Sequence, residues 1–178
     1  MFNWLRRHQP IKASTPQLAP AALADLGLIP VLDPQTLLQP RSKVIAEIHR
    51  LLALPDSQTG DLVTSALQSF AALVQLLPAS ESHHHAGQGG MLDHTLAVAV
   101  AALKIRAGFM LPPGCAPEAA GGRRILWSYA VFTAALLHDI GKPVGDQDIM
   151  LFDADGTPVG PWNPWLDTMV DHPRAKAY

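Results

Sequence analysis

Apolar residues recur every three or four positions in several stretches of the chain, which is the spacing of one face of an α-helix. The stretches are 41–54, 61–77, 91–107 and 123–140. The last two are rich in alanine and apolar nearly all round, which is typical of buried helices. Because proline interrupts helix interiors, Pro55 and Pro78 end the first two stretches. The pattern predicts an all-α fold in which residues 41–142 are almost entirely helical, with 111–122 as a loop.

Two short segments after Pro143 have the pattern of β-strands instead. Residues 148–153 and 157–162 flank the dipeptide Asp155-Gly156, a common turn in β-hairpins. We therefore expect strand only after residue 143, as one small C-terminal hairpin.

Proline is concentrated at the start of the chain, where six of the sixteen prolines fall within forty residues. We predict that residues 1–40 are a proline-rich segment, extended or loosely docked, and that residues 41–178 form the helical domain. The chain stops at Tyr178 without a helix-stop signal, so we expect the domain to continue beyond that residue.

Composition narrows the class of protein without indicating a function. The chain has 178 residues, of which 48% are apolar, and at this length folding buries roughly 70% of the unfolded surface. The single cysteine, Cys115, excludes an internal disulfide and CxxC-type zinc sites. A net charge of −2 excludes a strongly basic nucleic-acid-binding surface, although it does not exclude a local basic patch. The apolar runs 96–103 and 130–137 are too short to span a bilayer, and no signal peptide opens the chain, so we expect a cytoplasmic protein.

Metal-binding chemistry is suggested by His138 and Asp139, which follow a strongly apolar helix. Gly141 and Pro143 are expected to stop that helix. Neighbouring helix residues point about 100° apart, so these two side chains can reach one metal or bridge two. Imidazole with carboxylate suits Mn, Fe, Zn or Mg better than thiolate-selected metals. The alternative is a hydrogen-bonded core histidine beside a helix-end aspartate.

His94 lies in the first turn of the preceding apolar helix. Both helices are apolar nearly all round and must therefore pack together. Helical bundles build metal sites from such opposed side chains. We predict that His94, His138 and Asp139 converge between the two helices.

Three consecutive histidines, His83, His84 and His85, precede the helix that carries His94. Successive side chains of an extended or loop backbone alternate sides. We therefore expect His83 and His85 to face the cleft of His94, and His84 to point to solvent or a backbone acceptor.

A glycine-rich turn, with Gly87, Gly89 and Gly90, separates the histidines from that helix. Glycines let the backbone approach a ligand, and a helix N-terminus offers free N–H groups to an anion. The alternative is an ordinary flexible turn.

Two motif blocks resemble signatures of the HD superfamily of metal-dependent phosphohydrolases. They are HTLAVA from His94 to Ala99 and LLHDIGK from Leu136 to Lys142. The longer string LLPASESHHHAGQGGMLDH, residues 76–94, together with HDIGKP, resembles the N-terminal domain of TraI-like conjugative relaxases of the MobH class, found on plasmids and integrating elements. The resemblance covers about residues 28–170.

The resemblance implies an HD-domain-like helical bundle with a divalent metal (Mn, Fe, Mg or Zn). The ligands would be His94, His138, Asp139 and a later aspartate, with His83 and His85 as additional ligands from the triple histidine. Asp167 and Asp171 are candidates for the later aspartate, although the family spacing places it beyond Tyr178.

The resemblance also implies phosphate chemistry. Lys142 would contact a phosphate or steady a leaving oxygen, so Lys142 and Asp139 are the candidate catalytic residues. His84 and Lys142 are the candidate phosphate-binding residues. In a relaxase the nucleophile could be a tyrosine, but Tyr129 lies on an apolar helix and is expected in the core, and Tyr178 is the only other one. The nucleophile is therefore unassigned.

Other polar and aromatic positions have competing interpretations. Asp153-Ala154-Asp155-Gly156 resembles the start of a calcium loop but lacks its third ligand and terminal glutamate, which favours a hairpin turn. Asp146 is expected to support a site histidine by hydrogen bonding. Trp162 and Trp165 fit a core or packing surface better than a base-stacking platform. The pairs Arg6-Arg7 and Arg123-Arg124 could touch phosphates or be merely solvated.

Three functions are consistent with these features. The first is a metal-dependent domain that cleaves or transfers a phosphodiester, within a relaxase that nicks DNA at a transfer origin and works with other conjugation proteins. The second is a non-catalytic module that binds a nucleotide, DNA or another transfer protein on the same scaffold. The third is a helical domain with purely structural histidines. Metal content separates the third from the others, and phosphodiester turnover separates the first from the second.

Overall fold

Helices account for most of the protein in the computed structural model, which describes residues 20–55, 59–81 and 84–178. The helical elements are α1 (Pro20–Asp25), α2 (Pro34–Leu38), η1 (Gln39–Arg41), α3 (Ser42–Leu52), the π-helical η2 (Thr59–Thr64), α5 (Ser65–Val74), α6 (Gly90–Ala107), α7 (Pro117–Gly122), α8 (Arg124–Leu137) and α9 (Gly141–Gly145). The strands are β1 (Met150–Phe152) and β2 (Pro158–Pro161), which pair antiparallel. With 53% helix and 6% strand, the structure confirms the predicted fold class.

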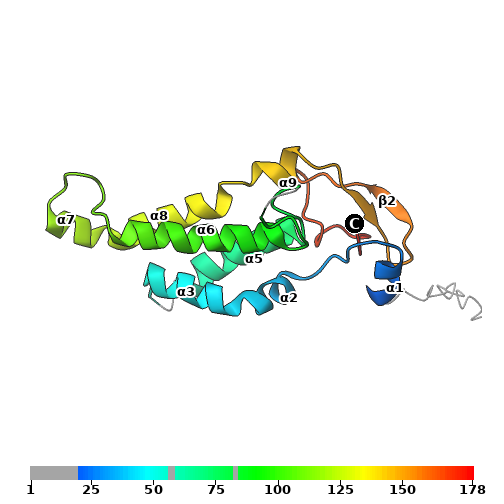
Figure 1. The fold of residues 1–178 in the computed structure, drawn as a ribbon, viewed down its shortest axis with the longest axis horizontal. Helices are drawn as coiled ribbons and strands as arrows, with labels where there is room; N and C mark the ends of the chain where they lie inside the picture. Colours follow the sequence, from blue (N-terminus) through cyan, green and yellow to red (C-terminus); the bar gives the residue numbers. More distant parts are fainter. Residues whose placement is uncertain (1–19, 56–58, 82–83) are drawn as a thin grey trace, which may run out of the picture.

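The helices α6 and α8 pack side by side along the long axis of the molecule, and α3 packs against α6 (Figure 1). The end that carries α7 lies opposite the end that carries the hairpin and the C-terminus (Figure 1). Between the two ends, the start of α6 meets the turn that joins α8 to α9. This is where the candidate site residues come together.

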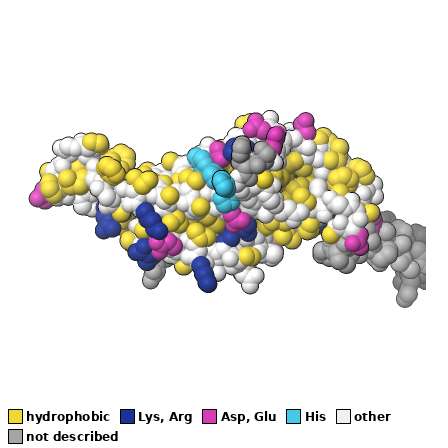
Figure 2. Space-filling model, in the orientation of Figure 1, with side chains coloured by type: hydrophobic (Ala, Val, Ile, Leu, Met, Phe, Trp, Pro, Cys, Tyr) yellow, Lys and Arg dark blue, Asp and Glu magenta, His cyan; other side chains and the backbone are white. Residues whose placement is uncertain are grey.

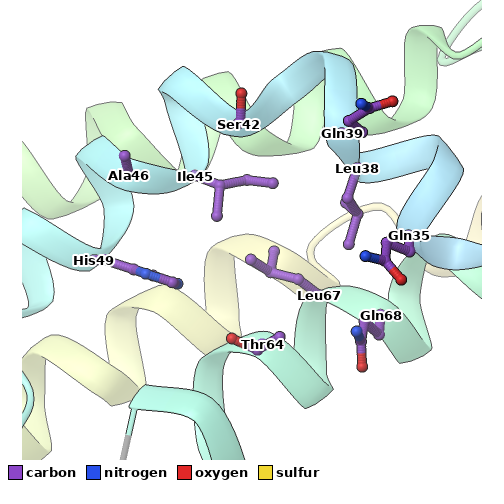
Figure 3. Close-up of a pocket in the computed structure, with 10 residues that line it drawn as sticks. All are labelled: Gln35, Leu38, Gln39, Ser42, Ile45, Ala46, His49, Thr64, Leu67 and Gln68. Carbon is purple, nitrogen blue, oxygen red and sulfur yellow. The ribbon is translucent and has the colours of Figure 1, made fainter. Parts of the chain in front are cut away.

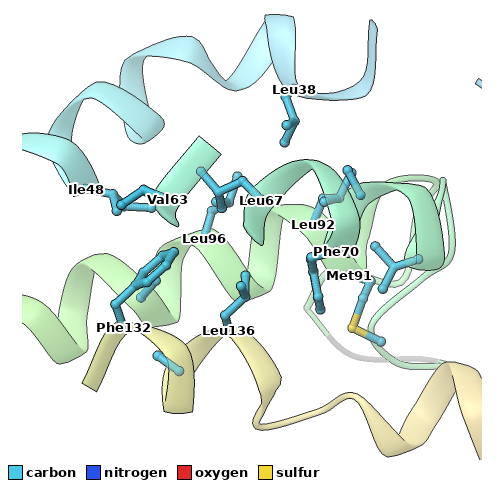
Figure 4. Close-up of a cluster of buried hydrophobic side chains, with 14 of the residues drawn as sticks. Leu38, Ile48, Val63, Leu67, Phe70, Met91, Leu92, Leu96, Phe132 and Leu136 are labelled. Atoms are coloured by element: carbon cyan, nitrogen blue, oxygen red, sulfur yellow. The ribbon is translucent and has the colours of Figure 1, made fainter. Parts of the chain in front are cut away.

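The main apolar core lies among α3, α5, α6 and α8 (Figure 4). Its most deeply buried side chains include Ile48, Leu96 and Phe132, each at most 2% exposed. α6 buries apolar residues on several sides because it has partners on both sides, which agrees with its nearly all-round apolar sequence. Replacing such a buried phenylalanine by alanine typically costs about 3–5 kcal/mol, so the core holds α6 and α8 firmly in register.

A second, smaller core packs the hairpin against Val31 and the C-terminal Tyr178. Leu77, Leu151, Trp162 and Met169 form its centre. The backbones of Ile29 and Tyr178 exchange two hydrogen bonds of 2.8 and 2.9 Å. The C-terminal residues thus lie between residues 29–31 and β1, and hold the hairpin against the helical part.

Two predicted irregular stretches contain short helices. Residues 34–38, expected to be extended or loosely docked, form α2, and Leu37 is buried in the main core. Asp33 caps this helix by accepting a hydrogen bond from the Thr36 N–H, and Pro34 occupies the first turn, so local capping chemistry explains the difference. The division of the chain at residue 40 stays a prediction.

The loop predicted over 111–122 contains α7 at its C-terminal end. Pro117 stands in the first turn of this helix, where its fixed φ angle suits a helix start, and Glu118 lies favourably near the positive end of the helix dipole. The hairpin, by contrast, lies where it was predicted, with Gly156 at φ +75° in its turn.

Candidate metal centre

Three side chains converge where α6 begins and α8 ends. His94 Nε2 lies 3.2 Å from His138 Nε2 and 3.5 Å from Asp139 Oδ2, and His138 Nε2 lies 3.4 Å from the same carboxylate oxygen. Among the described residues, this is the one group of at least three His, Cys, Asp or Glu side chains whose possible ligand atoms lie within 4.8 Å of one another. His94, His138 and Asp139 therefore converge between the two helices, as the sequence predicts.

The helix ends place these side chains. His94 is in the second turn of α6, whose register is fixed by its burial against α3 and α8. α8 ends at Leu137, earlier than predicted, and His138 is its C-cap residue. Gly141, expected to stop α8, instead begins α9. Asp139 lies in the turn between α8 and α9, and its carboxylate points back towards both histidines.

The donor set fits a divalent metal. A tetrahedral ion with bonds of about 2.0–2.1 Å has ligand atoms about 3.3–3.4 Å apart, and the three measured separations are 3.2, 3.4 and 3.5 Å. The side chains are 32%, 31% and 23% exposed for His94, His138 and Asp139, so the cluster is open to solvent on one side. Histidine side chains accordingly reach the surface as one group in Figure 2. Three protein ligands with an open side are the arrangement of catalytic rather than closed structural metal sites.

A backbone contact orients His138 for this task. Its Nδ1 lies 2.7 Å from the Ala135 carbonyl oxygen, so Nδ1–H donates and Nε2 presents its lone pair to the cluster. Metal-ligating histidines are typically held by such a bond from the other ring nitrogen.

The pKa values of His94 and Asp139 are both shifted in the direction that favours the metal-binding protonation state. Burial and the neighbouring His138 lower the pKa of His94, which favours neutral imidazole. The hydrogen bond from Lys142 is the main cause that lowers the pKa of Asp139, which favours the carboxylate. Neutral imidazole and ionised carboxylate are the forms that coordinate metals.

Lys142 connects the cluster to the preceding loop. Its Nζ donates to Asp139 Oδ2 at 2.6 Å and to the Ala79 carbonyl at 3.1 Å. It also lines a cavity of about 370 Å3 together with Glu81 and Asp146. The lysine thus stands at the border between the cluster and this cavity.

The triple histidine is described in part. His83 lies outside the described residues. His85 faces the cluster, with its ring centroid 5.6 Å from that of His94, but it is not one of the three converging ligands. His84 is exposed, and its backbone carbonyl accepts a hydrogen bond from Ser80. Ligand and phosphate roles for these residues stay predictions.

The glycine turn packs against the helix rather than leaving it open for an anion. The N–H groups of Gly90 and Met91 donate to the carbonyls of Gly87 and Leu77, so these two are not free for an anion, which favours the ordinary turn of the two alternatives. A Cβ on Gly90 would lie 1.9 Å from the His85 carbonyl oxygen. The glycine therefore lets the histidine loop approach the start of α6.

Arg41 is a positioning residue that sequence reasoning did not single out. Its guanidinium donates to Asp93 Oδ1 at 2.7 Å, to the Leu37 carbonyl at 2.7 Å and to the Gly89 carbonyl at 3.3 Å. It thereby ties η1 to Gly89, just before α6, and to Asp93 in the first turn of α6. Asp93 was the available signal, because it stands in the first turn of α6 next to His94, where the helix dipole favours a carboxylate that can also accept a hydrogen bond from a cation.

The other acidic candidates do not join the cluster. Asp167 and Asp171 are not among its converging ligands, and the Asp171 carboxylate accepts a hydrogen bond from Thr168. Asp146 lies beside Lys142, to whose carbonyl its N–H donates, but no hydrogen bond to a site histidine is recorded within the described residues. Asp153 Oδ1 accepts from the N–H groups of Asp155 and Thr157, which supports the hairpin-turn interpretation.

Both tyrosines and Trp162 occupy packing positions. Tyr129 packs against Phe132, and burial raises the pKa of Tyr178 to about 12, which makes that hydroxyl a poor nucleophile. Trp162 is buried as expected, whereas Trp165 is 81% exposed and does not belong to the core.

A separate cavity of about 470 Å3 lies between α3 and the η2–α5 segment (Figure 3). Leu38, Ile45 and Leu67 form its apolar wall, and His49 borders it. It contains none of the residues predicted for the metal site.

The fold and the site define a mostly helical domain with a solvent-open His–His–Asp cluster. Residues 29–178 match the TraI_2 protein family, described as "Putative helicase", and the chain belongs to this family. It is a TraI-like, conjugation-related domain. No curated protein matches the chain. Within the described residues, no helix is both long and apolar enough to cross a membrane.

Proposed function

We propose that this chain is the HD-type, metal-dependent domain of a conjugative DNA relaxase, and that it cleaves or transfers a phosphodiester. The observation that carries the proposal is the convergence of His94 Nε2, His138 Nε2 and Asp139 Oδ2 at 3.2–3.5 Å. This spacing matches the ligand separation of a small divalent cation. Membership of a TraI-like family supports DNA as the substrate.

The three residues would hold the cation and leave positions open for substrate. A divalent metal in such a site polarises a phosphoryl oxygen and lowers the pKa of a bound water. Mn, Fe, Mg and Zn all suit a set of two imidazoles and one carboxylate, because none of them requires thiolate ligands.

Lys142 would act on the phosphate. Its ammonium, held by Asp139 and the Ala79 carbonyl, borders the cavity next to the cluster. A lysine ammonium has three N–H donors, so one stays available for a phosphate oxygen when these two bonds are made. From there it can neutralise charge that develops on the phosphoryl or leaving oxygen.

His85 would add to the same electrostatic environment. Its ring faces that of His94 from the loop before α6, with the ring centroids 5.6 Å apart. A neutral His85 could coordinate the metal, and a protonated His85 could attract an anionic substrate.

The experiment that tests the proposal measures metal and turnover together. Protein purified without a nickel column is analysed for bound metal by mass spectrometry, and then assayed on a single-stranded oligonucleotide and on a chromogenic phosphodiester with each metal added. We expect about one or two bound ions per chain and metal-dependent cleavage. His94→Ala and His138→Ala abolish both, whereas His84→Ala, the histidine control for metal content, keeps the bound metal because this residue is exposed and outside the cluster.

Two other results would each select another function. Bound metal without turnover would indicate a binding module on the same scaffold, to be followed by measuring affinity for nucleotides and DNA. No bound metal, and no effect of added metal on the unfolding temperature, would indicate that the histidines are structural.

A further inference from the structure

A second candidate binding site lies at the opposite end of α6 from the metal centre. Arg106, in the last turn of α6, is only 7% exposed. His94 and Arg106 are twelve residues apart on one helix, which is about 18 Å at 1.5 Å per residue. The two sites are thus separate in space.

The Arg106 guanidinium carries a buried charge that no carboxylate balances. Nη1 donates to the Phe109 carbonyl at 2.9 Å and Nη2 to the Arg124 carbonyl at 3.3 Å. Nε is buried and has no hydrogen-bond partner. Within the described part of the chain, no acidic side chain lies within 4 Å of Arg106. Since a buried charge is costly unless it is paired, this position favours an anion supplied from outside.

A cavity of about 230 Å3 gives an anion access to this region. Arg106 and Arg124 line it, together with Phe109, Met110 and Leu111. Arg124 is exposed, as is its neighbour Arg123, so positive charge lies at the cavity beside the buried Arg106. The volume is that of an amino-acid side chain rather than of a whole nucleotide.

Large exposed hydrophobic side chains accompany these arginines. Phe109 and Met110 line the cavity, and Ile105, Ile125 and Leu126 lie within two positions of a lining residue in the chain, each of the five between 42% and 65% exposed. Hydrophobic side chains are visible over this end of the molecule in Figure 2. Contiguous exposed apolar surface marks contact sites, and arginine with aromatic and methionine side chains is the composition of protein interfaces.

We propose that this end of the molecule, formed by residues 105–126, binds an acidic and apolar peptide segment of a partner protein. A glutamate or aspartate of the partner enters the cavity and pairs with Arg106 and Arg124. Apolar residues beside that carboxylate cover Phe109, Met110 and Leu126. A DNA backbone fits less well, because it offers a row of phosphates and no apolar groups to cover this surface.

Nuclear magnetic resonance tests the proposal on the whole chain. The probe is a capped tripeptide, phenylalanine–glutamate–leucine, and its matched control has glutamine in place of glutamate. A buried arginine Nε–H gives a resolved signal, so binding is followed at Arg106 itself. We expect a saturable shift with the glutamate peptide and at least about ten-fold weaker binding of the glutamine peptide, since a charge-assisted hydrogen bond is lost.

Arg124→Gln is the informative variant, because this side chain is exposed and only its backbone carbonyl supports Arg106. We expect it to weaken the glutamate peptide about five- to ten-fold and to leave the glutamine peptide and the metal content unchanged. Equal binding of both peptides, stronger binding of an eight-nucleotide oligothymidylate than of the glutamate peptide, or no shift at Arg106 would each overturn the proposal.

Discussion

His94 Nε2 lies 3.2 Å from His138 Nε2, although the two residues are 44 positions apart in the chain. His138 donates Nδ1–H to the Ala135 carbonyl and so faces His94 with a lone pair. Two imidazole lone pairs do not approach this closely without a proton or a cation between them. Either the Nε2–H of a neutral His94 donates to the His138 lone pair or, under the proposed function, a cation lies between the two nitrogens; Asp139 Oδ2 lies 3.4–3.5 Å from both rings.

The first prediction concerns metal binding. His94→Ala and His138→Ala each remove one of three converging ligands, and loss of one ligand from such a site reduces affinity by orders of magnitude. We expect about a hundred-fold or greater weakening of Mn or Zn binding in titration calorimetry, since even residues that only support ligands contribute about ten- to a hundred-fold.

Histidines outside the cluster provide the controls for that measurement. His84→Ala should leave metal binding nearly unchanged because this residue is exposed and contributes only a backbone carbonyl to the loop. His85→Ala should give a smaller loss than His94→Ala, because its ring faces His94 without joining the three ligands. Equal losses for His84→Ala and His85→Ala would contradict the alternation of the histidine loop.

The second prediction concerns the pH dependence of stability in the metal-free protein. Burial is the main cause that lowers the pKa of His94 below 6.5, so the folded protein takes up this proton later than the unfolded chain does. As the pH falls through 6.5, the unfolded state binds more protons, and the free energy of unfolding decreases until the folded pKa is passed. Asp139, whose pKa lies below 3.8, adds a second loss below that pH.

Urea denaturation between pH 8 and pH 5 separates the effect of His94 from that of Asp139, which stays ionised in that range, and comparison with His94→Gln removes the contribution of the other histidines. We expect the wild-type chain to lose more stability over this interval than His94→Gln, which has nothing to protonate at that position. The same decrease in both proteins would show that His94 does not carry the effect.

The third prediction concerns Lys142, whose hydrogen bond is the main cause that lowers the pKa of Asp139. Lys142→Met should raise that pKa towards 3.8, which carbon-detected titration of the carboxyl group measures directly. Lys104→Met is the matched control, because Lys104 pairs with Glu47 and not with Asp139. An unchanged titration in Lys142→Met would mean that the surrounding charges, rather than this bond, set the pKa.

The helices of the core could be predicted from sequence because burial imposes a 3.6-residue period, and α6 and α8 both have it. The short helix α2 was not predicted, because its sequence does not show this period. At five residues it has too few turns to show a period, and it depends on the Asp33 cap and on burial of Leu37. Short helices are decided by end chemistry and tertiary contacts, which proline counting does not reveal.

The centre of the candidate site was predictable because α6 and α8 are apolar nearly all round and pack together, so the few polar side chains at their facing ends meet. The residues that hold the site in place were not predictable. Arg41 reaches Asp93 across 52 positions, and its partners Leu37 and Gly89 contribute carbonyls that carry no side-chain signal. Bonds to backbone oxygens depend on how the segments are placed in space, so sequence spacing alone does not indicate them.

The last prediction tests why the histidine loop lies against α6. A Cβ on Gly90 would stand 1.9 Å from the His85 carbonyl oxygen, which is backbone and cannot swing away, whereas a Cβ on Gly87 meets nothing within 4 Å. Gly90→Ala must therefore displace the loop, and we expect a loss of about 2–3 kcal/mol in urea denaturation, as for other overpacked positions. Gly87→Ala should change stability by less than about 0.5 kcal/mol. If His85 is placed by this close approach, Gly90→Ala also abolishes the nuclear Overhauser contact between the rings of His85 and His94, and a preserved contact would mean that the loop is held by other bonds.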